Sequence, residues 1–77
     1  MQIKVYTTPT CHFCQKVKDY LKAKNVAYSE LDVSKNPQYA QEMVQKSGQM
    51  GVPVVLLGNQ IVVGFDKPKI DKILNLN

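Results

Sequence analysis

Short runs of β-forming residues alternate along the chain with stretches of helical periodicity. Residues 2–6 predict a first strand, and residues 27–33 predict a second, in which apolar and charged side chains alternate. Residues 53–57 and 60–63 flank a Gly-Asn pair, and a two-residue turn of this type is typical of a β-hairpin. The sequence therefore predicts four strands.

Three stretches have apolar side chains at helical spacing. The first covers residues 11–24. The second begins with Asn36 as N-cap and Pro37 at the first helical position, and Gly48 suits its end. Asp66 can cap the third helix. The side chains expected to face inward are Phe13, Val17 and Leu21 in the first helix, Ala40, Met43, Val44 and Ser47 in the second, and Ile70, Ile73 and Leu74 in the third.

The predicted order is β-α-β-α-β-β-α, an α/β arrangement. The first two strands are joined through a helix, so they should be parallel with a right-handed crossover. The hairpin adds antiparallel strands, and helices should cover both faces of the resulting four-stranded mixed sheet. A length of 77 residues predicts a single domain over residues 1–77.

The charge pattern argues against a nucleic-acid partner. The net charge is +4, but every basic residue is Lys, and Arg is the residue that suits bidentate contacts with bases and phosphates. The lysines are spread along the chain, so we expect most of them to be solvated. No apolar run reaches the roughly 20 residues that span a bilayer, and the first residues do not resemble a signal peptide. We therefore expect a cytoplasmic monomer without a membrane partner.

The two cysteines point to redox chemistry. Cys11 and Cys14 lie at the predicted start of a helix, directly after a strand and a Pro-containing turn. The free N–H groups and partial positive charge at a helix start stabilise a thiolate, so the pKa of Cys11 should fall from ~8.5 into the roughly 3.5–7.5 range of such cysteines. Cys11 would attack a substrate disulfide, and Cys14, one turn further and facing the core, would resolve the mixed disulfide.

Two other interpretations of the cysteine pair are metal binding and simple burial. A tetrahedral zinc site needs four ligands, whereas this chain offers two Cys and one His within four residues. A zinc or iron–sulfur site would therefore need a second chain, which leaves a metal-sharing dimer as an alternative function. The spacing near a βαβ pattern favours the redox interpretation, with no metal.

Two residues between the cysteines are candidate modulators. The partial positive charge of His12 at neutral pH would help to hold a thiolate, or His12 is simply an exposed loop residue. Phe13 fits either packing or an apolar surface that faces the substrate.

Three segments carry a resemblance to the glutaredoxin-like proteins of the thioredoxin superfamily. The resemblance extends over nearly the whole chain, and the three segments occur in the same order and at similar separations. The chain is most similar to the minimal bacterial and archaeal type and close to the redoxins that serve ribonucleotide reductase. The segments are Tyr6-Thr7-Thr8-Pro9-Thr10-Cys11-x-x-Cys14, Gly51-Val52-Pro53 and Val63-Gly64-Phe65-Asp66.

The resemblance implies the thioredoxin/glutaredoxin fold and a thiol–disulfide oxidoreductase that reduces protein or glutathione mixed disulfides. It implies a cis bond between Val52 and Pro53, with the Val52 backbone pairing with an extended substrate. It also implies that Gly64, Phe65 and Asp66 contact glutathione, the expected co-substrate, with no cofactor bound.

The sequence departs from the family pattern at three positions. Thr8 replaces the usual Lys, Val63 replaces the first Gly of the Gly-Gly pair, and His12 replaces the Pro between the cysteines. Because Thr8 removes a partner for the glycyl carboxylate of glutathione, a flavoprotein of the thioredoxin-reductase type is the alternative reductant. The expected partners are thus disulfide-containing proteins and one of these two reductants.

Overall fold

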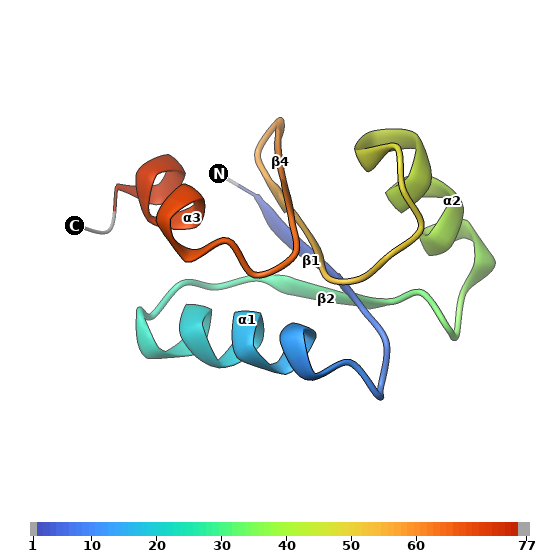
Figure 1. The fold of residues 1–77 in the computed structure, drawn as a ribbon, viewed down its shortest axis with the longest axis horizontal. Coiled ribbons are helices and arrows are strands. Elements are labelled where there is room, and N and C mark those ends of the chain that lie inside the picture. The colour runs from blue at the N-terminus through green and yellow to red at the C-terminus, as the bar shows by residue number, and fades with distance from the viewer. Residues whose placement is uncertain (1, 76–77) are drawn as a thin grey trace.

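The computed structural model describes residues 2–75, which form a four-stranded sheet with three helices (Figure 1). The element order confirms the predicted β-α-β-α-β-β-α fold. The elements are β1 (Ile3–Thr7), α1 (His12–Ala23), β2 (Ser29–Asp32), α2 (Pro37–Ser47), β3 (Val54–Leu57), β4 (Gln60–Val63) and α3 (Lys67–Leu74).

The strands lie in the order β2-β1-β3-β4. β1 pairs with β2 in parallel, as predicted, and with β3 in the antiparallel direction, while β3 and β4 form the antiparallel hairpin. Tyr6 lies opposite Val54, and Val54 lies opposite Val63. The end of β1, the start of β3 and the end of β4 therefore meet at one end of the sheet.

Each face of the sheet has its own core, because successive side chains of a strand point to opposite faces. On one face, Val17 and Leu21 of α1 and Ile70 of α3 are buried with Val5 and Val55 of the sheet. On the other face α2 packs through Met43, which is buried with the side chains Tyr6, Val54 and Leu56. Figure 1 shows α2 set apart from α1 and α3, and this confirms that helices cover both faces.

The helix ends follow the predicted capping chemistry. The side chain of Asn36 accepts a hydrogen bond from the Gln38 N–H, and Asp66 accepts one from the Lys69 N–H, so both satisfy free donors at a helix start. Gly48 ends α2 with a φ of 76°, in the left-handed region that favours glycine.

The predicted element bounds differ slightly from those observed. The strand expected over residues 27–33 is limited to Ser29–Asp32, since β2 pairs only with β1 and the register runs from Lys4–Ser29 to Thr7–Asp32. The single domain expected over residues 1–77 includes residues 1, 76 and 77, which lie outside the described residues. Within residues 2–75, no helix is both long and apolar enough to cross a membrane.

Candidate active site

Cys11 lies where the chain leaves β1 and enters α1. It is the N-cap of α1, with φ −92° and ψ 113°, and its Sγ accepts a hydrogen bond from the Cys14 N–H at 3.0 Å. Its own N–H donates to the Thr8 carbonyl at 3.4 Å, so the Pro-containing turn holds it in place. A sulfur that accepts an N–H at a helix start is in the environment that favours a thiolate.

Cys14 forms a disulfide with Cys11 across the first turn of α1. The two Cα atoms are 5.2 Å apart, within the usual range for a disulfide. Cys14 is only 1% exposed, whereas Cys11 is partly exposed. The difference in exposure expected from the sequence is therefore present. Solvent and a substrate can reach Cys11 but not Cys14.

The segment that ends in Pro53 lies at the same end of the sheet as Cys11. The Val52–Pro53 bond is cis, as the family resemblance implied. The Pro53 carbonyl accepts a hydrogen bond from the Gly64 N–H at 2.9 Å, which connects this segment to the turn after β4. Gly64 has a φ of 76°, a conformation that a side chain would disfavour. Val52, Pro53 and Gly64 are thus brought together.

The turn that contains Phe65 and Asp66 is fixed by packing between α1 and α3. The Phe65 ring meets the Tyr20 ring edge-on, with centroids 5.9 Å apart. The Tyr20 hydroxyl donates to Asp71, whose carboxylate also pairs with Lys67. The hydrogen bond to Asp71 raises the pKa of Tyr20 to about 12. The Phe65 side chain therefore serves packing, and contact between Phe65 or Asp66 and glutathione stays a prediction.

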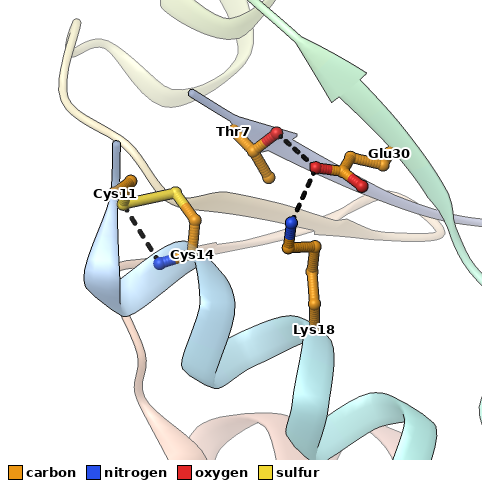
Figure 2. The surroundings of a disulfide bond; sticks show 5 residues. All are labelled: Thr7, Cys11, Cys14, Lys18 and Glu30. Atoms are coloured by element: carbon orange, nitrogen blue, oxygen red, sulfur yellow. Dashed lines mark hydrogen bonds and ion pairs between the residues drawn. A yellow bond between two sulfur atoms is a disulfide. The ribbon is translucent and has the colours of Figure 1, made fainter. Parts of the chain in front are cut away.

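A polar network lies beside the disulfide (Figure 2). The Thr7 hydroxyl and the Lys18 ammonium both donate to Glu30 Oε2, each at 2.9 Å. The hydrogen bond from Lys18, and then that from Thr7, lower the pKa of Glu30. The Lys18 side chain is only 18% exposed, so Lys18 is an exception to the expectation that most of the lysines are solvated. Sequence reasoning missed this network because its members are 12 and 23 positions apart.

Three large apolar side chains of the described residues are exposed. Phe13 is 58% exposed, so the expectation that it faces inward with Val17 and Leu21 is wrong, and the Lys16 ammonium lies 5.3 Å from its ring centroid. Met50, which precedes the cis-proline, is 80% exposed, and Val63, at the end of β4, is 45% exposed.

His12 is exposed and lines a shallow depression of about 420 Å³ with Pro9, Thr10, Cys11 and Gln15. Within residues 2–75, no three His, Cys, Asp or Glu side chains gather as metal ligands would.

Comparison with known proteins decides the family. The sequence profile of the glutaredoxin family, described as "Glutaredoxin", matches residues 3–62. The chain belongs to the glutaredoxin family. An uncharacterised glutaredoxin-like 8.6 kDa protein encoded in a rubredoxin operon of Clostridium pasteurianum is 44% identical over 72 residues, 94% of this chain and 96% of the relative.

Two solved structures show how far the likeness to other glutaredoxin-like and thioredoxin-like proteins extends. The thioredoxin-like protein BC3987 superposes with a TM-score of 0.88 at 35% identity, over 94% of this chain and 99% of that protein. The glutaredoxin-like NrdH-redoxin from Escherichia coli, which has a thioredoxin-like activity profile, superposes with a TM-score of 0.79 at 27% identity, over 100% and 96%. Membership of the glutaredoxin family indicates thiol–disulfide redox chemistry, and Cys11 and Cys14 are the residues of this chain that suit it.

Proposed function

We propose that this glutaredoxin-family chain is a dithiol–disulfide oxidoreductase. The observation that carries the proposal is the unequal pair at the start of α1. Cys11 is partly exposed and accepts the Cys14 N–H at 3.0 Å, while Cys14 is buried within bonding distance of it. This arrangement suits one thiol that meets the substrate and a second that acts only afterwards.

The proposed reaction has two exchange steps. The Cys11 thiolate attacks one sulfur of the substrate disulfide; that S–S bond breaks, and the other sulfur leaves and takes up a proton. Cys14 then loses its proton and attacks the Cys11 sulfur, which releases the second substrate thiol. The substrate has gained two electrons and two protons, and the chain is left with the Cys11–Cys14 disulfide.

We propose that the substrates are disulfide-containing proteins as well as glutathione mixed disulfides. Phe13 and Met50 support protein substrates, because exposed Phe and Met side chains are enriched at protein interfaces, and Val63 adds further exposed apolar surface. The end of β1, the start of β3 and the end of β4 meet beside Cys11, so an extended substrate segment could lie along the Val52 backbone there.

Glutathione is the reductant that we propose for the oxidised chain, which would act in the cytoplasm. Two glutathione molecules would supply the two electrons and leave as glutathione disulfide. The second candidate is a redoxin reduced by a flavoprotein of the thioredoxin-reductase type. Similarity to NrdH-redoxin over the whole chain and the Thr8 and Val63 departures favour this candidate.

The test is coupled turnover of a small disulfide with NADPH. One assay contains glutathione and its reductase, and the other contains thioredoxin reductase. We expect turnover in the first assay, and we expect Cys11→Ser to abolish it. Turnover in the second assay alone would select the flavoprotein-dependent redoxin. No turnover in either assay, with Cys11 unreactive towards disulfides, would contradict the proposed function.

A further inference from the structure

Two charged residues, Lys18 and Glu30, lie beside the buried cysteine. Lys18 follows Cys14 by one turn of α1 and reaches Glu30 on β2, and Glu30 also accepts the hydroxyl of Thr7, the last residue of β1. Figure 2 shows this network next to the disulfide. Glu30 is 42% exposed and Lys18 only 18%, so the network extends from solvent into the protein.

The second exchange step of the proposed function requires a thiolate at Cys14. Cys14 must become a thiolate although it is 1% exposed and has almost no contact with water. Burial alone disfavours a thiolate. Figure 2 places two charged residues near the disulfide, Lys18 from α1 and Glu30 from β2, together with the uncharged Thr7 from β1, and His12 is exposed at the helix start.

We propose that Lys18 and Glu30 are positioning residues that set the charge at Cys14 and thereby the rate at which it resolves the mixed disulfide. The proposal rests on the dithiol function proposed above. Neither residue touches the reacting sulfur atoms of the substrate. Lys18 favours the thiolate because it is a cation one helical turn away. Glu30 holds Lys18 in place, and its own negative charge opposes the thiolate.

The two residues therefore act on Cys14 with opposite sign. Without the Lys18 charge, Glu30 alone would face Cys14 and fewer molecules would carry the thiolate. With Gln in place of Glu30, an amide oxygen could still accept from Thr7 and Lys18, but the opposing charge would be gone. If the ion pair served only to hold the structure together, Lys18→Met and Glu30→Gln would change the rate of the second step in the same direction, because each variant breaks the same contact.

The size of the effect follows from the thiolate population. A change of one pKa unit alters the thiolate fraction about tenfold. Because a less basic thiolate is also a weaker nucleophile, the rate changes by about threefold for such a shift. A unit charge at a distance of about 6 Å, comparable with the Cβ spacing of residues one turn apart, is sufficient for a shift of this order near a protein surface.

The experiment measures the two exchange steps separately. The reduced chain is mixed with a symmetrical aromatic disulfide whose thiolate product is coloured, and colour is followed in a rapid-mixing instrument. The first product thiolate reports attack by Cys11, and the second reports resolution by Cys14. The variants are Lys18→Met, Glu30→Gln and the charge-conserving Lys18→Arg. Lys22→Met is the matched control, because Lys22 is an exposed lysine one further turn along α1.

We expect the second phase to slow by about threefold in Lys18→Met and to accelerate by a similar factor in Glu30→Gln. Lys18→Arg and Lys22→Met should match the wild type, and the first phase should change little in every variant. A shift in the same direction for Lys18→Met and Glu30→Gln, or no shift in either, would overturn the proposal. A wild-type chain without a second phase would overturn the dithiol function and this proposal with it.

Discussion

Replacing Tyr6 by Phe tests a hydrogen bond that holds α2 against the sheet. The same hydrogen bond helps to position the segment that runs from α2 to Pro53. The Tyr6 ring is fully buried, and its hydroxyl donates to Glu42 Oε1 at 2.5 Å. Tyr6→Phe keeps the ring and removes only this hydrogen bond. The Glu42 carboxylate keeps Lys4 at 3.4 Å and is 31% exposed, so water can replace part of the lost contact.

The expected loss follows from the charge on Glu42. Hydrogen bonds to charged groups contribute roughly 1.5–3 kcal/mol, and solvent access to Glu42 favours the lower end, so we expect about 1.5 kcal/mol. For a domain of this size, that loss lowers the melting temperature by roughly 6–12 °C. Urea unfolding followed by circular dichroism would measure the free energy of unfolding. Tyr39→Phe is the matched control, because Tyr39 is on α2 and its hydroxyl makes no hydrogen bond in the described part of the chain.

The effect of Tyr6→Phe should depend on pH in a defined way. The Tyr6 hydroxyl, and then Lys4, lower the pKa of Glu42 below its ordinary value of 4.5. A carboxyl whose pKa is lowered by folding stabilises the fold above that ordinary value, and this contribution disappears as the pH falls through the lowered pKa. Burial, and then Glu42, raise the pKa of Tyr6 above 10.0, so the wild type should also lose its advantage at higher pH.

The stability difference between wild type and Tyr6→Phe should therefore be largest between pH 4.5 and 10.0 and should shrink outside that range. If Tyr6→Phe were as stable as the control Tyr39→Phe at neutral pH, the hydrogen bond assigned between Tyr6 and Glu42 would be refuted. A difference that persists unchanged in strong acid would refute its dependence on the Glu42 charge.

Two further predictions concern the site and α3. Iodoacetamide should modify Cys11 before Cys14 in the reduced chain, with a midpoint at least about one pH unit below that of a free thiol, because Cys11 is at a helix start; peptide mapping that finds Cys14 labelled first would be the opposite result. Asp71→Asn should destabilise the fold at neutral pH, because Tyr20 and Lys67 lower the pKa of Asp71 and thus favour its charged form. That difference should diminish in acid, and an equally stable variant at neutral pH would show that the charge contributes nothing.

The fold could be predicted from the sequence because each element carries local signals. Asn36 and Asp66 cap helices as predicted, and the apolar spacing in α1 placed Val17 and Leu21 in the core. The cysteine pair is also local, since both thiols belong to one helical turn. Relative burial of Cys11 and Cys14 follows from the same helical periodicity.

The polar pairs could not be predicted in this way. Tyr6 and Glu42 are 36 positions apart, and Tyr20 and Asp71 are 51 apart, so no periodicity connects them. Their contacts depend on how α2 packs on the sheet and how α3 packs on α1. Asp71, a buried carboxylate, has no signal in the sequence that separates it from an exposed one.

The most direct test of the central claim is to trap the reaction after its first step. In Cys14→Ser, the resolving thiol is gone while the Cys11 environment at the start of α1 is kept. After mixing with a small disulfide, mass spectrometry of the intact chain and of its peptides should find one substrate half attached to Cys11 in nearly every molecule. Cys11→Ser should carry no adduct under the same conditions. An adduct on Cys14 in Cys11→Ser, or none on Cys11 in Cys14→Ser, would contradict the proposed roles.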